Sequence, residues 1–162
     1  PGDLATPRWH FIGQLQRNKA KAIAWNMDCF HALDRESLAL ELEKHAAQAG
    51  RRLDVLIQVN LSGEARKGGI SADETQSFLA SLAHLSHLRP IGLMTLPPAT
   101  EDPESNRPYF AQLREWRDEL RNVEGLEKIR GLSMGMSQDF EIAVEEGATY
   151  VRVGTALFGA RT

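Results

Sequence analysis

Short apolar runs recur along this chain, and each is followed by a polar turn and then by a helical pattern of apolar positions. The runs cover residues 9–13, 29–33, 53–60, 88–94, 129–134 and 150–153. The apolar residues of the third run do not alternate cleanly with polar ones, which is typical of a strand covered on both faces, as in a parallel sheet. The repetition therefore predicts six strands, each leading toward a helix.

Three of the intervening segments carry helix start signals. Ser71 and Glu74 have the spacing of a capping box, and Asp102 followed by Pro103 gives an N-cap and a first-turn proline. Asp34 is expected to start a helix that runs over residues 37–49 and ends at Gly50. The predicted buried stripes of these helices are Phe78, Leu82 and Leu85; Tyr109, Leu113, Trp116 and Leu120; and Leu38, Leu42 and Ala46.

Strands that alternate with helices predict βαβ units and an α/β fold with a parallel sheet. The 162 residues give 27 for each of six units, whereas a complete TIM-type (β/α) barrel has roughly 250 residues, or about 31 per unit. We interpret residues 1–162 as a single partial barrel domain with about six of eight units. An open doubly wound sheet is the alternative.

Because the chain begins at Pro1 and leads quickly into an apolar strand, we expect the first barrel strands to be missing. A barrel without two strands exposes two parallel edges, so the fragment is expected to self-associate.

The amino-acid composition limits the classes of protein to which this chain can belong. With 42% hydrophobic and 25% charged residues the chain is an ordinary globular protein, and a net charge of −3 without a basic block argues against a nucleic-acid partner. A single cysteine, Cys29, favours a reducing compartment and is interpreted as a small core residue. No apolar run approaches the roughly 18 residues of a membrane helix, so we expect a cytoplasmic protein without a membrane contact.

The stretch 132–139 places small residues and a serine between an apolar strand and a helix expected near Gln138. Ser137 is the predicted N-cap of that helix. Free N–H groups at a helix start favour a phosphate oxygen, and a serine hydroxyl adds a donor. The alternative is that Ser137 only caps its helix.

Arg152, Gly154 and Thr155 follow the last strand. Gly154 allows the backbone to approach a ligand closely, and Thr155 offers an amide and a hydroxyl. Phosphate-binding loops after the last two strands recur in eight-unit barrels, so Ser137 and this segment together predict a phosphate cup.

The arginine of that segment is a fixed cation that can donate to an anionic oxygen or to an aromatic ring nitrogen. If the ligand were pyridoxal 5′-phosphate, Arg152 could donate to an unprotonated pyridine nitrogen. The alternative is a surface arginine paired with Glu141 or Glu145.

The chain resembles the pyridoxal phosphate homeostasis protein family, which is similar to the N-terminal barrel of alanine racemase. The resemblance runs from about residue 9 to 161 and rests on the stretches 9–19, 58–62 with Glu64 and 67–69, 92–95, 133–137, and 152–155 with 158–159. It implies a fold-type III barrel that binds pyridoxal 5′-phosphate at the carboxyl ends of its strands, serves vitamin B6 homeostasis and has no established catalytic activity. It also implies PLP-dependent enzymes as acceptors of the cofactor.

By this resemblance, each candidate residue receives a role. Ser137, Gly154 and Thr155 would hold the phosphate and Arg152 would face the pyridine nitrogen. Asn60 and Met94 are weaker candidates to line the pocket, and a core role is the better interpretation of Met94. No metal is implied.

The family's Schiff-base lysine lies upstream of the motif that starts at Trp9, so it is not present in this chain. Lys19 and Lys67 follow strands closely, but neither lies in the family's lysine motif. Two other functions stay open: a PLP-dependent amino-acid racemase, and a sugar-phosphate enzyme that uses the same cup.

The remaining histidines give weaker signals. His84 and His87 have a spacing that can hold a metal, yet no thiol or carboxylate ligand accompanies them, so we interpret them as solvated. His10 is expected to be packed or hydrogen-bonded.

Overall fold

The fold is one six-stranded parallel sheet whose strand order follows the chain. The computed structural model describes residues 6–64 and 68–159. The strands are β1 (His10–Phe11), β2 (Cys29–Leu33), β3 (Leu53–Gln58), β4 (Leu88–Met94), β5 (Gly131–Met136) and β6 (Tyr150–Arg152). All neighbouring pairs are parallel, so the six predicted strands are confirmed.

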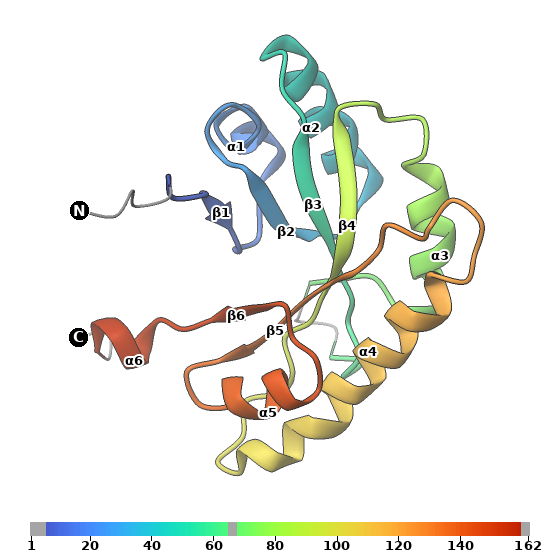
Figure 1. Cartoon of the computed structure of the whole chain (residues 1–162). Helices are drawn as coiled ribbons and strands as arrows, with labels where there is room; N and C mark the ends of the chain where they lie inside the picture. The colour runs from blue at the N-terminus through green and yellow to red at the C-terminus, as the bar shows by residue number, and fades with distance from the viewer. Residues whose placement is uncertain (1–5, 65–67, 160–162) are drawn as a thin grey trace.

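Helices connect the strands. They are α1 (Ala20–Asn26), α2 (Glu36–Gln48), α3 (Ala72–Ser81), α4 (Arg107–Leu120), α5 (Phe140–Glu145) and α6 (Thr155–Phe158), with two 3₁₀ turns, η1 (Arg17–Lys19) and η2 (Pro103–Asn106). Figure 1 shows α2 to α5 on the outer side of the curved sheet. Among the described residues, no helix is both long and apolar enough to span a bilayer.

The strand order decides between the two predicted architectures. A doubly wound sheet reverses its strand order at a switch point, whereas a (β/α) barrel adds each strand beside the last. The order here is sequential, and the sheet curves until β1 and β6 face each other on its open side (Figure 1). The ring centroids of His10 and Tyr150 from these edge strands are only 5.6 Å apart. The partial barrel is confirmed, and the open doubly wound sheet is excluded.

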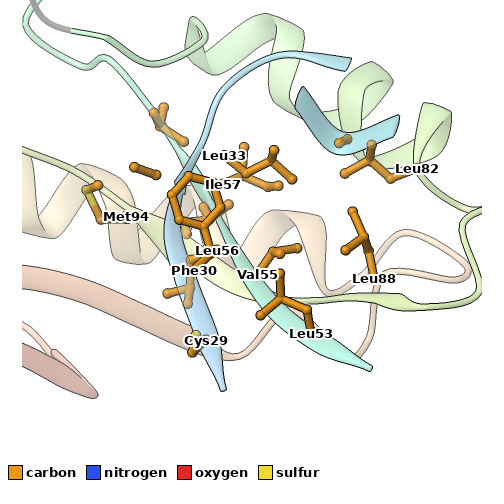
Figure 2. Packing of buried hydrophobic residues seen from close by; sticks show 14 of the residues in the cluster. Cys29, Phe30, Leu33, Leu53, Val55, Leu56, Ile57, Leu82, Leu88 and Met94 are labelled. Carbon is orange, nitrogen blue, oxygen red and sulfur yellow. The ribbon is translucent and has the colours of Figure 1, made fainter. Parts of the chain in front are cut away.

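The hydrophobic core lies between the sheet and its outer helices. Phe30 of β2 and Phe110 of α4 are fully buried, as are Leu42 of α2 and Leu56 of β3. Figure 2 shows the side chains from β2, β3 and β4 packed against one another. Cys29 is also fully buried, which confirms it as a core residue.

Two of the three predicted helix starts are confirmed. Ser71 and Glu74 form the capping box of α3, with the Ser71 N–H donating to Glu74 Oε2 at 3.3 Å. Asp102 accepts a bond from the Glu104 N–H at 3.1 Å, although it caps η2, which then leads into α4.

The third predicted start is wrong by one residue. Arg35 occupies the N-cap of α2, which begins at Glu36, and the Asp34 carboxylate makes no cap bond. Instead, Asp34 Oδ1 pairs with Arg35 Nη1 at 2.6 Å. The neighbouring guanidinium therefore holds the carboxylate that the sequence assigns to the helix start.

Two predicted buried stripes are confirmed at Leu82, Leu85, Leu113 and Leu120 and differ from the prediction at one member each. In α4 Phe110 is fully buried together with Leu113, while Tyr109 is only half-buried. In α3 Leu79 is buried, while Phe78 lies at the margin of the core. Adjacent apolar residues fit the same helical period, so only packing against the sheet decides which one points inward.

Candidate functional site

Arg152 projects from the end of β6 toward two neighbouring strands. Its Nη1 donates to Ser133 Oγ of β5 at 2.9 Å, and its Nη2 donates to the backbone oxygen of Thr95, just after β4, at 2.9 Å. These two acceptors fix the plane of the guanidinium in a largely buried position. Burial lowers the pKa of Arg152 to about 10, so the group keeps its charge at neutral pH.

Within residues 6–64 and 68–159, this guanidinium has no carboxylate at ion-pair distance. The predicted alternative, a surface pair with Glu141 or Glu145, is wrong, because Glu145 Oε2 instead binds Arg107 Nη2 at 2.6 Å. A buried cation without a carboxylate partner is costly unless another acceptor or anion comes close. The site therefore favours a ligand that offers one.

Ser137 and Gly154 come together although 17 residues separate them. Ser137 Oγ accepts hydrogen bonds from the Gly154 and Ala156 N–H groups, each at 3.2 Å. Thr155 lies between these two amides at the start of α6. The loops after β5 and β6 thus form one structure, as the sequence predicts.

The prediction that Ser137 caps the next helix is wrong. The helix α5 begins at Phe140 with Asp139 at its N-cap position, and its cap makes no side-chain bond. Ser137 is free of that role because a turn separates it from the helix. Its hydroxyl is directed to the β6–α6 segment instead.

Asp139 organises the turn that carries Ser137, a role that sequence reasoning missed. Its side chain is only 4% exposed. Oδ1 accepts from the Met136 N–H at 2.6 Å, and Oδ2 accepts from Asn106 Nδ2 at 2.8 Å. These bonds occupy the carboxylate and tie the turn to η2. An acidic residue that follows a serine in a stretch of small residues was the only signal available.

Two cavities meet at Arg152 and Gly154. One, of about 380 Å³, lies between the loop after β4 and the turn after β5, and its lining includes Ser137 and Thr155. The other, of about 560 Å³, opens toward β1 and β2 and is lined by His10, His31 and Tyr150 among others. A ligand in this region meets the arginine and the loops after β5 and β6 together.

A further cavity, of about 460 Å³, lies between α3 and the loop that precedes β5. Its lining is mostly aliphatic, with Leu79, Leu82 and Leu85 among its residues. It lies at the amino ends of β4 and β5, away from the cup. In parallel α/β folds ligands bind at the carboxyl ends of the strands, so this cavity is the weaker candidate.

The structure does not bring the other candidate residues into the two cavities at Arg152. The Asn60 side chain bonds within its own loop, where Nδ2 donates to the Glu64 oxygen at 2.9 Å. Met94 is fully buried in the core. Their pocket roles stay predictions. Lys19 is an exposed residue of η1, and Lys67 lies outside the described residues.

One group of metal-ligating side chains occurs in the described part of the chain, formed by His10, Cys29 and His31. Its ligand atoms lie within 4.8 Å of one another. However, His10 Nδ1 and His31 Nε2 are already hydrogen-bonded at 2.9 Å, and burial raises the pKa of the Cys29 thiol to about 12. A metal would have to displace that bond and a thiol proton, so we interpret the group as a hydrogen-bonded one.

The interpretation of His84 and His87 as solvated is confirmed for His84 only, which is exposed. It is wrong for His87, whose Nδ1 binds Glu43 Oε1 of α2 at 2.8 Å. The same carboxylate accepts from the His87 and Leu88 N–H groups. His87 therefore joins α2 to the start of β4.

Parallel strands in sequential order, with polar groups gathered at the carboxyl ends of the last two, define the class as a (β/α)-barrel domain. The family profile described as "Alanine racemase, N-terminal domain" matches residues 4–162.

Similar proteins with assigned names narrow the family to which this domain belongs. The chain is 48% identical over 153 residues to the pyridoxal phosphate homeostasis protein of Aquifex aeolicus, covering 94% of this chain and 67% of that protein. It is 42% identical to the protein of the same name from Vibrio cholerae, covering 94% of this chain and 64% of that one. PipY of Synechococcus elongatus, solved with PLP bound, matches with a TM-score of 0.87 and 36% identity over 97% of this chain and 73% of that one.

The chain therefore belongs to the alanine racemase N-terminal domain family and, within it, to the pyridoxal phosphate homeostasis proteins. It spans about two thirds of the length of these curated relatives, 67% and 64% for the two named above.

Proposed function

We propose that this chain binds pyridoxal 5′-phosphate non-catalytically and serves vitamin B6 homeostasis. The observation that carries the proposal is the largely buried Arg152 guanidinium, which has no carboxylate partner in the described residues and lies beside the Ser137 and Gly154 contact. Ser133 Oγ and the Thr95 oxygen accept from two of its N–H groups, so the remaining N–H groups can donate to a ligand, and the adjoining loops offer neutral donors for an anion. The names of the relatives and the PLP-bound PipY structure support the same ligand.

The residues present fit the chemistry of this cofactor. A Cβ built on Gly154 meets nothing within 4 Å, so the space above this backbone is open to a ligand group. Ser137 and Thr155 supply hydroxyl groups for the phosphate, and Arg152 supplies a fixed donor for the ring nitrogen. When bound, the cofactor supplies an aldehyde carbon and an electron-withdrawing ring. Donation by an arginine keeps the ring nitrogen unprotonated, which weakens that withdrawal and suits storage or delivery more than catalysis.

Equilibrium dialysis tests the proposal. The chain should retain pyridoxal 5′-phosphate more tightly than pyridoxal, which lacks the phosphate, and inorganic phosphate should compete. Equal retention of the two compounds would contradict the phosphate cup.

The racemase alternative has less support. The relatives at 42–48% identity are named homeostasis proteins, whereas the matching alanine racemase of Clostridium difficile is 18% identical and shows the fold alone. Incubation of the full-length protein with the cofactor and L-alanine separates the two functions, because a racemase forms the D isomer continuously. A sugar-phosphate enzyme would bind its substrate without the absorbance change of a bound aldehyde.

The proposal extends to partners. PLP-dependent enzymes would receive the cofactor from the site. A second copy of the chain would pair with the sheet edges β1 and β6, beside which Trp9 is 62% and Phe158 is 87% exposed.

A further inference from the structure

A chain of hydrogen bonds with a buried centre leads from Arg152 across the inside of the sheet to β1. Arg152 Nη1 donates to Ser133 Oγ at 2.9 Å, Ser133 Oγ lies 2.8 Å from His31 Nδ1, and His31 Nε2 lies 2.9 Å from His10 Nδ1. Ser133 is fully buried and His31 is 2% exposed. Four strands, β6, β5, β2 and β1, each contribute one member.

The arginine sets the direction of the first hydrogen bond, and the acceptors that the described residues offer to the Ser133 hydroxyl set the others. A guanidinium has no acceptor, so Ser133 Oγ accepts from it. In the described residues the hydroxyl proton has one acceptor, His31 Nδ1. His31 then carries its proton on Nε2 and donates to His10 Nδ1, which leaves the proton of His10 on its Nε2. The network assigns both tautomers, and both rings are neutral.

The surroundings keep His31 neutral. Arg152 lies at one end of the chain, and Arg8, Asp28 and Asp54 act on His10 at the other. The rings of Tyr150 and His31 lie 5.2 Å apart in an edge contact. Burial lowers the pKa of His31 to about 4, with His10 and Arg152 adding to the shift. Asp139 is the acid that acts on Arg152 itself.

We propose that His31, oriented by His10, positions Arg152 through Ser133, and that this chain makes the site selective for a ligand ring with an unprotonated, accepting nitrogen. The inference rests on the proposed function, because the ligand is the same. Ser133 Oγ and the Thr95 oxygen hold two arms of the guanidinium, so its remaining N–H groups are presented at a fixed angle. Without the proton-accepting His31, the Ser133 hydroxyl is free to turn its proton toward Arg152 and repel it.

Binding of two ligands to matched variants tests the positioning role. The ligands are pyridoxal 5′-phosphate and its 1-deaza analogue, in which a carbon replaces the ring nitrogen. His31→Leu should weaken the affinity for pyridoxal 5′-phosphate by roughly threefold to tenfold, the range of one net hydrogen bond, and leave the analogue unchanged. His31→Asn should restore most of the loss, because its side-chain oxygen can accept from Ser133. His84→Leu, at an exposed position, is the control.

The outcomes separate this inference from the proposed function. If the unaltered chain does not distinguish pyridoxal 5′-phosphate from pyridoxal, the proposed function fails. If it does, but His31→Leu weakens both ring compounds equally or neither, the positioning role fails.

A measurement on the unaltered chain covers the case in which His31→Leu does not fold. Nitrogen-15 NMR of the labelled histidines at neutral pH should show His31 and His10 as neutral Nε2–H tautomers. A proton on His31 Nδ1 would overturn the proposal.

Discussion

The Ser137 hydroxyl accepts a hydrogen bond from the Gly154 N–H at 3.2 Å and so joins the loop after β5 to the loop after β6. The same oxygen accepts from the Ala156 N–H. The N–H groups of Gly154 and Ala156 therefore already point at a single oxygen atom, Ser137 Oγ. A phosphate oxygen is an acceptor of the same kind, so a bound anion needs little rearrangement of the backbone.

Ser137→Ala and Thr155→Ala are each expected to weaken the affinity for pyridoxal 5′-phosphate by about tenfold to a hundredfold, since a hydrogen bond to a charged group contributes roughly 1.5–3 kcal/mol. Equilibrium dialysis measures the change. Ser77→Ala, at an exposed position of α3, is the control. Affinity equal to that of the control in both variants would remove these residues from the site.

Arg152→Met is expected to reduce the affinity by about tenfold or more, because the ring nitrogen loses a charged donor. The free energy of unfolding should change by only about 1–2 kcal/mol. Removing the buried cation is favourable, while the Thr95 oxygen loses its donor. Arg121→Met, at an exposed site, is the comparison. A large loss of stability with unchanged binding would make Arg152 structural only.

Stability should fall as the solution is acidified from about pH 6.5 to pH 4, in part because of His31. Burial lowers its pKa to about 4 in the folded chain from the ordinary value of 6.5, so the unfolded chain binds the proton first. The contribution is complete above pH 6.5 and amounts to at most about 3 kcal/mol. Urea unfolding at pH 7.5 and pH 4.5 measures it. His31→Asn should flatten this dependence and His84→Gln should not; identical slopes in all three proteins would contradict the assignment.

The sequence was informative about the strands and the cup for different reasons. Apolar runs mark strands because both faces of a parallel sheet are covered, and Ser137 and Gly154 follow consecutive strands whose carboxyl ends must meet. Side-chain partners were less accessible. The bonds of Ser137 to Gly154 and of Asp34 to Arg35 depend on turn geometry that residue type does not specify.

The buried histidine chain could not be predicted, because its members come from strands far apart in the sequence. His31 and Ser133 are 102 positions apart and meet only because the sheet curves. One sign was present: each is a polar residue inside an apolar run. In a strand covered on both faces, such a residue needs a partner from another strand.

Self-association through the sheet edges should respond to a charge on β6. Val151 is 40% exposed on this strand, and Val151→Lys places a cation where a second strand would pair. Analytical ultracentrifugation should show a shift toward monomer. Val144→Lys, on α5 at 55% exposure, adds the same charge away from the edge and should not produce the shift. A monomer in the unaltered chain would contradict pairing at the edges.

Gly135 connects the packing of β5 to the position of Ser137. Its φ of +87° is a backbone conformation that residues with a side chain rarely adopt. An added Cβ would lie 2.5 Å from the Ala143 Cβ and 3.0 Å from the Phe140 Cα. Gly135→Ala therefore combines a backbone cost of about 1–2 kcal/mol with overpacking of about 1–3 kcal/mol.

Gly125→Ala isolates the first of these costs, because Gly125 has a φ of +86° but nothing within 4 Å of the added Cβ. Urea unfolding should show a loss of about 1 kcal/mol for Gly125→Ala and a loss larger by about 1–3 kcal/mol for Gly135→Ala. Since the Cβ clash is with α5, relief requires the turn of residues 136–139 to move, and Ser137 moves with it. Gly135→Ala should therefore also weaken the affinity for pyridoxal 5′-phosphate, whereas Gly125→Ala should not. Equal losses of stability in the two variants would show that the added Cβ at position 135 is accommodated between β5 and α5 without destabilising overpacking.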